Sequence, residues 1–123
     1  MAGKIVADTL EHSTAGSLTT DYVVEGSAKA WLSSDATTSP YDSFNISSGT
    51  DHGTGDYSHT LTNAYSTRTG YSQAGAVYTS AGGATITRNS SRDAAGTIAV
   101  EVTNAAGTAA DASHNVMTHG DLA

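Results

Sequence analysis

The sequence predicts an all-β fold, an antiparallel β-sandwich of about seven short strands, and two observations carry this prediction. Apolar residues recur at every second position in short runs, which is the period of a strand with one buried face. Glycine-rich and polar turns separate these runs at spacings of about 10 to 15 residues, as in sandwich domains. The alanine-rich segments contain Gly, Thr and Ser rather than Leu, Glu and Lys, so helix is not expected.

The clearest run is a hairpin over residues 42–61. Its first arm, residues 43–49, alternates apolar and polar side chains. The middle, residues 49–56, contains three glycines and two aspartates, which favour a chain reversal. The second arm, residues 56–62, resumes the alternation and brings Tyr57, His59 and Leu61 to one face.

Five further strands complete the expected sandwich. The strongest is residues 97–103, because Ile98, Val100 and Val102 point to one side of it. Trp31 is interpreted as a core residue and Tyr57 as a core or interface anchor, since aromatic side chains dominate burial where aliphatic ones are scarce. The other four strands are expected at residues 28–33, 71–79, 84–88 and 115–119.

Residues 1–26 differ from the rest of the chain, because polar, turn-forming residues surround isolated apolar ones. No face of this stretch can bury itself, so we expect an extended N-terminal arm that is ordered only by docking on a neighbour. The sandwich domain is expected over residues 27–123. The apolar side chains expected to make the docking contacts are Ile5, Val6, Leu10 and Leu18.

The composition indicates a thin hydrophobic core. The chain has 16 Ser and 19 Thr but only 16 Val, Ile and Leu together. With one Phe added, these residues make up about 14% of the chain, below the roughly 20% at which disorder becomes the default interpretation. The period-2 runs and the modest net charge of −7 argue against disorder. We therefore expect a β domain that gains its missing burial by self-association.

Several function classes are not expected. The chain has no cysteine, so it has neither a disulfide nor a thiolate metal site. Membrane insertion is not expected, since no apolar run approaches 18 residues. Nucleic-acid binding is not expected either, because five scattered Lys and Arg residues do not form the basic stripe that a phosphate backbone requires.

No cofactor, resident metal or catalytic residue is expected. The loop around Asp51 and Asp56 supplies fewer oxygens than the six to eight that Ca²⁺ prefers. The five histidines include no His-x-His pair, although a metal held between subunits stays open. Ser, His and Asp are abundant, but the G-x-S-x-G elbow of hydrolases is absent. We therefore do not expect an enzyme.

Exposed aromatic and cationic side chains on loops are candidates for ligand contact, because aromatic rings stack on sugars. Tyr65 and Arg68 lie on the expected loop at residues 63–70. Arg92 lies on the expected turn at residues 89–96. These three residues are the predicted ligand-contact positions.

Three motifs of this sequence occur together in a known family. They are GSAKAW at residues 26–31, DSFNISS at 42–48 and the D-x-G-T-G-D-Y turn at 51–57. In this combination they resemble a domain widespread in tailed bacteriophages, particularly marine ones, with the pattern K-A-W…D-S-F-N-[VI]-S-S…D-x-G-T-G-D-Y. The leader at residues 7–24 and the closing H-G-D at 119–121 also resemble that family.

The chain departs from the family pattern at several positions. Leu32, Ser33 and Ser34 replace the usual V-N-F, and residues 35–40 replace a Gly-Thr-Gly linker. His52 and His59 stand where the family usually has Asn and a hydrophobic residue or Asn. The first two differences lie around the first expected strand.

The resemblance implies a non-enzymatic virion protein on the exterior of a phage particle. It would be a short fibre or spike-type homotrimer attached to the particle through residues 1–26. Its implied partners are further copies of itself, other virion proteins of the capsid, portal or tail, and host cell-surface polysaccharide met by the loops at 63–70 and 89–96. The alternative is a capsid or tail decoration protein whose contacts are only to other virion proteins.

Overall fold

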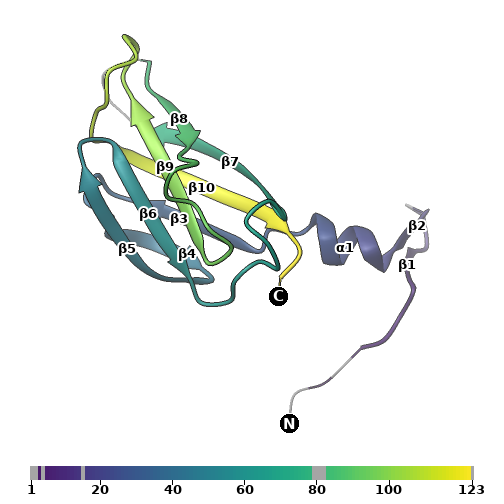
Figure 1. Ribbon diagram of the computed structural model, residues 1–123. Helices are drawn as coiled ribbons and strands as arrows, with labels where there is room; N and C mark the ends of the chain where they lie inside the picture. Colours follow the sequence, from purple (N-terminus) through teal and green to yellow (C-terminus); the bar gives the residue numbers. More distant parts are fainter. Residues whose placement is uncertain (1–2, 4, 15, 79–82, 123) are drawn as a thin grey trace.

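A computed structural model describes residues 3, 5–14, 16–78 and 83–122 (Figure 1). Two four-stranded antiparallel sheets lie one over the other, and a two-stranded hairpin and a short helix precede them in the chain (Figure 1). The prediction of an all-β, sandwich-like fold is therefore confirmed.

The first sheet joins strands from both ends of the sandwich sequence. The C-terminal strand lies in its middle and pairs with the first strand on one side and the fourth predicted strand on the other. Its strand order is β4 (Pro40–Phe44), β3 (Ala30–Ser34), β10 (Ser113–Gly120) and β7 (Tyr71–Tyr78). The predicted end of that fourth strand at Thr79 lies outside the described residues.

The second sheet contains the predicted hairpin and the strong strand that follows it. The hairpin's second arm pairs with that strand over five residues, from Asp56 opposite Glu101 to Thr60 opposite Thr97. The strand order is β5 (Ile46–Gly53), β6 (Asp56–Leu61), β9 (Thr97–Thr103) and β8 (Thr85–Arg88).

The core lies between the two sheets and is formed by side chains at alternate strand positions. Ile98, Val100 and Val102 are fully buried on one face of β9, as predicted, and Tyr57 is also fully buried. Trp31 is 37% exposed, so its assignment to the core is wrong. The reason is register, because the inward positions of β3 belong to Ala30, Leu32 and Ser34.

The predicted strand at residues 43–49 is two strands in two different sheets. β4 ends at Phe44 and β5 begins at Ile46. Between them Asn45 adopts a positive φ of 61°, which bends the chain from one sheet to the other. Its side-chain amide donates to the Lys29 carbonyl at 3.1 Å, and its amide oxygen accepts from the Asn63 N–H at 2.7 Å. These hydrogen bonds hold the crossing in place.

The chain reversal of the hairpin is narrower than predicted. Residues 49–53 still belong to β5, and only Thr54 and Gly55 separate it from β6. Gly55 has a φ of +72°, and a Cβ there would lie 2.3 Å from the Val102 carbonyl oxygen. Both conditions require glycine, so this residue fixes the position of the turn.

The N-terminal part of the chain is not the extended arm that its composition predicts. It forms a small hairpin of β1 (Thr9–His12) and β2 (Gly16–Thr19), followed by helix α1 (Thr20–Gly26). Residues 1, 2, 4 and 15 lie outside the described part of this segment.

Local charge explains why a helix of seven residues forms where no helix was expected. Asp21 lies in its first turn, where the helix dipole favours a negative charge. At the other end Lys29 donates to the Val24 carbonyl, one of the carbonyls that a helix end leaves without an intrahelical partner. The Lys29 N–H also donates to the Thr118 carbonyl of β10 at 2.8 Å, which ties the helix to the end of the sandwich.

Replacing Asn45 with alanine should lower the free energy of unfolding by about 2 kcal/mol. Alanine is strained at positive φ, and it makes none of the hydrogen bonds to Lys29 and Asn63. Urea unfolding of the full chain measures this loss. Asn45→Gly is the matched control, because it removes the strain but still loses the hydrogen bonds, and it should cost about 1 kcal/mol less than alanine. Equal losses in both variants would contradict the contribution of the backbone conformation.

Candidate functional site

Tyr65 is not on the surface. Its side chain is 1% exposed and stacks on the ring of Tyr71 with 4.6 Å between the centroids. Its hydroxyl is 2.5 Å from the hydroxyl of Thr118 in β10, and its N–H donates to the Ala95 carbonyl. A backbone bridge to Leu122 holds the loop against the end of the sandwich. Tyr65 is therefore a core residue, and its prediction as a ligand contact is wrong.

Arg68 lies beside the buried carboxylate of Asp93. Its Nε donates to Asp93 Oδ1 at 2.8 Å, and Arg88 Nε donates to Oδ2 at 2.6 Å. The guanidinium of Arg88 also lies 4.2 Å from the centre of the Tyr71 ring. The Asp93 side chain is fully buried, whereas half of the Arg68 side chain, 51%, is exposed. Burial alone would raise the pKa of Asp93, but the two arginines outweigh it and hold the pKa below its usual value.

Arg92 is engaged in a second, more exposed pair. Its Nε donates to Asp56 Oδ2 at 2.7 Å, and Asn89 donates to the other oxygen of the same carboxylate at 3.0 Å. Both of the predicted loop arginines therefore take part in internal ion pairs that join the loops to the strands. Their contact with an external ligand stays a prediction.

Two histidines that were not among the predicted site residues meet inside the sandwich. His59 in β6 and His114 in β10 are fully buried, and their Nε2 atoms are 3.1 Å apart. The Nδ1 of His114 donates to the Ala112 carbonyl, which leaves its Nε2 as an acceptor for the Nε2–H of His59. The Nδ1 of His59 is then an unprotonated nitrogen without a hydrogen-bond partner. The alternation that placed His59 beside Tyr57 and Leu61 was the signal for its burial.

The histidine pair lacks the orienting carboxylate of a hydrolytic triad. The partner of His114 Nδ1 is a backbone carbonyl rather than a carboxylate, and both rings are shielded from solvent. Among the residues that the structure describes, no three His, Asp or Glu side chains gather closely enough to hold a metal ion.

Asp51 and Asp111 accept from backbone N–H groups of the hairpin turn. Asp51 accepts from the N–H of Gly53 at 2.8 Å. Asp111, from the other end of the sandwich sequence, accepts from the N–H of Gly55 at 2.7 Å and from the hydroxyl of Tyr57 at 2.9 Å. Burial, followed by this bond to a carboxylate, raises the pKa of Tyr57.

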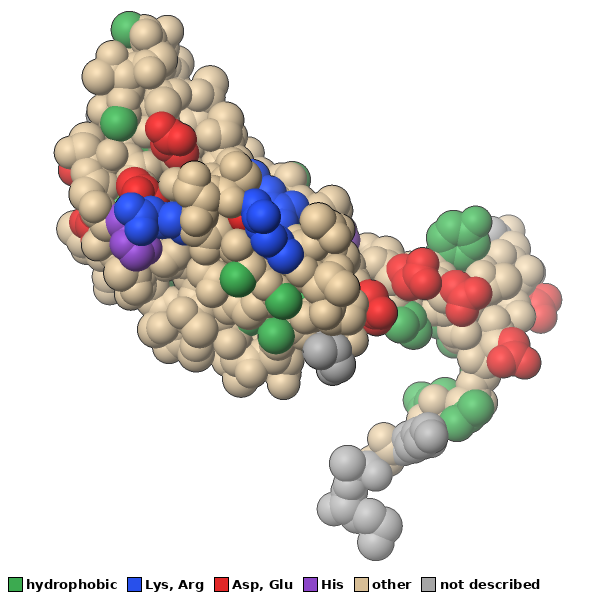
Figure 2. All heavy atoms as spheres, in the orientation of Figure 1, with side chains coloured by type: hydrophobic (Ala, Val, Ile, Leu, Met, Phe, Trp, Pro, Cys, Tyr) green, Lys and Arg blue, Asp and Glu red, His purple; other side chains and the backbone are tan. Residues whose placement is uncertain are grey.

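The N-terminal segment, which we define as residues 5–26, presents apolar side chains that its own fold leaves uncovered. Figure 2 shows it projecting from the sandwich with hydrophobic and acidic side chains on its surface. One side is an open groove, the N-terminal groove, lined by Ile5, Val6, Ala7, Leu10, Thr20, Val23 and Val24. The groove brings three of the four predicted docking residues together. Leu18 is also exposed but does not line the groove.

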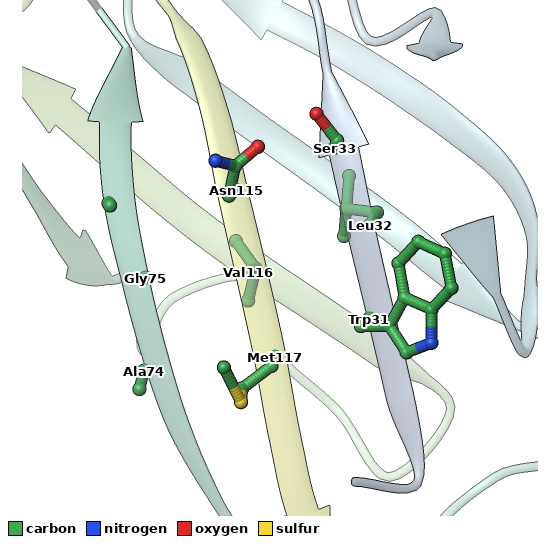
Figure 3. Close-up of a pocket in the computed structure, with 9 residues that line it drawn as sticks. Trp31, Leu32, Ser33, Ala74, Gly75, Asn115, Val116 and Met117 are labelled. Carbon is green, nitrogen blue, oxygen red and sulfur yellow. The ribbon is translucent and has the colours of Figure 1, made fainter. Parts of the chain in front are cut away.

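A second uncovered apolar surface lies on the outer side of the first sheet. Trp31, Met117 and Ala74 stand opposite one another on β3, β10 and β7, and all three are at least one-third exposed (Figure 3). They line a shallow hollow together with residues 32–33, 75–76 and 115–116. This surface was not predicted, because its residues are far apart in the chain and only the strand order brings them together.

Comparison with protein-family models, with characterised proteins and with solved structures finds no match for this chain. None of the helices in the described part of the chain has the length and hydrophobicity that a bilayer crossing requires. The candidate sites are therefore the two uncovered apolar surfaces, the N-terminal groove and the outer side of the first sheet.

Proposed function

We propose that this chain is a non-enzymatic structural protein on the exterior of a tailed-phage particle, attached through its N-terminal segment and assembled as a homotrimer. The motif resemblance supplies the phage context. The observation that carries the attachment role is the N-terminal groove, in which Val6 and Val24 are 79% and 62% exposed. Apolar side chains arranged on one side of a projecting segment favour burial against another protein.

Contacts to other virion proteins are better supported than contacts to a host glycan. A glycan-binding loop needs available aromatic and polar side chains. On the loops at residues 63–70 and 89–96, Tyr65 is buried and Arg68 and Arg92 are held in ion pairs. The main contribution of these three side chains is to hold the loops against the sandwich. The half-exposed Arg68 keeps the host-polysaccharide alternative open to a direct binding test.

The most buried titratable groups of the described residues are held within the fold. The buried histidine pair is closed to solvent, and the carboxylates of Asp93 and Asp111 are engaged with arginines, a tyrosine hydroxyl and backbone N–H groups. A general acid or base must reach a substrate proton, and none of these groups has that access.

Replacing Val23 with aspartate should reduce incorporation into phage particles by at least about tenfold while the sandwich stays folded. The substitution places a charge in the N-terminal groove, where burial against a virion partner would be costly. Quantitative immunoblotting of purified particles measures incorporation. Thermal unfolding checks that the sandwich stays folded. Val23 is not buried, so its replacement should leave the sandwich intact.

Tyr22→Asp is the matched control on the same helix. Tyr22 lies on the opposite, acidic side of α1 with Asp21 and Glu25, so the same charge there should leave incorporation nearly unchanged. Normal incorporation of the Val23→Asp variant would refute the attachment role.

A separate experiment distinguishes the fibre or spike-type protein from the decoration protein. Binding of labelled protein to host cells, blocked by free surface polysaccharide, would favour the fibre or spike-type protein.

A further inference from the structure

Exposed apolar side chains form a row across the outer side of the first sheet, which we call the apolar face. One row crosses all four strands, with Phe44, Trp31, Met117 and Ala74 as register neighbours. Phe44 and Met117 are 55% and 49% exposed, so about half of each side chain meets solvent. An antiparallel sheet with one solvated face normally carries polar residues there. This row breaks that rule.

The two halves of the apolar face differ in relief. The half made by β4 and β3 carries the bulky rings of Phe44 and Trp31, whereas β7 carries Ala74 and Ala76 opposite them. The next outer residue of β7, the exposed Tyr78, lies beyond the hollow at the end of the strand. Figure 3 shows Trp31 on one side of Met117 and the small residues of β7 on the other. A raised half and a hollow half on one face are complementary to each other.

We infer that the apolar face is the surface on which copies of this chain pack, with Trp31 and Phe44 of one copy seated over the Ala74–Ala76 hollow of the next. This inference rests on the proposed homotrimer and names its interface. Because both halves lie on one face, two copies can meet reciprocally about a two-fold axis, and three copies can meet in turn around a closed ring. The proposed homotrimer corresponds to the ring. Three copies would bring their Met117 side chains together near the axis.

Charge favours a second copy of this chain as the occupant. The chain carries a net charge of −7, so two copies repel wherever charged surfaces meet. The next row of the apolar face holds Ser33, Asn115 and Ala76, with Asp42 only at the edge strand. In these two rows β3, β10 and β7 carry no charged side chain, so identical acidic chains can approach each other at this face.

The exposed area agrees with a missing partner. A compact protein of 12.4 kDa exposes about 6,100 Å², whereas this chain exposes 7,431 Å². The difference of about 1,300 Å² exceeds the roughly 800 Å² that each partner buries in an interface of standard size. The projecting N-terminal segment contributes part of this surplus. On the sandwich itself, the half-exposed side chains of Phe44 and Met117 are the apolar surface that a partner would cover.

Met117→Glu tests the inference in the full-length chain. The wild type should sediment as a trimer at about 100 µM, and the variant should weaken the association by at least about 100-fold, because three carboxylates would meet in an apolar interface. Trp31 is the sole tryptophan of the sequence, so its emission reports burial of this face directly. We expect a shift to shorter wavelength as wild-type concentration rises and no shift in the variant.

Thr50→Glu is the matched control. It adds the same charge to the exposed side of β5, in the other sheet, and should leave both the sedimentation and the emission shift unchanged. Ala76→Glu repeats the test from the hollow half if Met117→Glu does not fold. A wild type that stays monomeric at about 100 µM, or an assembly that neither variant weakens, would overturn the inference. A dimer that Met117→Glu dissociates would support the apolar face and contradict only the trimer of the proposed function.

Discussion

Replacing Asp93 with alanine should lower the free energy of unfolding by about 3 kcal/mol, a large share of the 5–15 kcal/mol typical of a domain. The Asp93 carboxylate is fully buried and accepts from Arg68 at 2.8 Å and from Arg88 at 2.6 Å. Its removal leaves two neighbouring cations without their shared counter-ion. Because both arginines keep partial access to water, we expect the lower end of the range known for broken buried pairs. Urea unfolding at pH 7 measures the loss.

Asp56→Asn provides the control, because it breaks the more exposed pair with Arg92. That pair has side chains 41% and 24% exposed, so its loss should cost less than about 1 kcal/mol. Equal losses in the two variants would show that burial does not determine the effect. The lowered pKa of Asp93 adds a second readout: its stabilisation is present above pH 3.8 and should disappear as the pH falls further.

The strands were predictable because their signal is local. In β9 the large apolar residues Ile98, Val100 and Val102 alternate with smaller or charged ones, and they therefore identify both the strand and its core face. The same holds for β6, where the alternation also placed His59 inside. Local alternation, however, gives no information on which sheet a strand joins.

The errors have physical causes that lie outside such local patterns. The apolar positions 44 and 46 alternate correctly, yet Asn45 between them adopts positive φ and moves the chain to the other sheet. Trp31 was assigned inward by its size, but Leu32 takes the inward position. Tyr65 is buried by backbone contacts to Ala95 and Leu122, which are distant in sequence.

The candidate sites were likewise predictable only where their sequence signal is local. Ile5, Val6 and Leu10 were predicted from their isolation among polar residues, and the structure gathers them in one groove. The groove also needs Val23 and Val24, which a helix of seven residues presents. That helix depends on Lys29 and on its junction with β10, so helix propensity alone did not predict it.

Lowering the pH from 6.5 towards 4 should destabilise the protein by roughly 3 kcal/mol through the buried histidine pair. Burial, and then the proximity of His114, lowers the pKa of His59 from 6.5 to about 4. Burial also lowers the pKa of His114, against the opposing effects of the Ala112 carbonyl and Asp35. A proton on His59 Nδ1 would have no acceptor in the core.

The sign follows from the protons bound in each state. Between pH 4 and 6.5 His59 of the unfolded chain binds a proton that the folded chain does not, so the free energy of unfolding falls as the pH falls. Above pH 6.5 both states are neutral and the stabilisation is complete. The stabilisation from Asp93 is lost only below pH 3.8, which separates the two effects on the pH axis.

Urea unfolding at several pH values measures the slope, and His59→Gln identifies its origin. Glutamine does not titrate but keeps an N–H donor that can face His114 Nε2, so the variant should lose a large part of the slope and retain that of His114. His52→Gln removes an exposed imidazole, whose Nε2 contacts Ser58, and should preserve the slope. Fully buried rings with an unpartnered Nδ1 should accept a proton less readily in the folded chain than in the unfolded chain. A wild-type free energy of unfolding that stays constant between pH 4.5 and 6.5 would contradict this expectation.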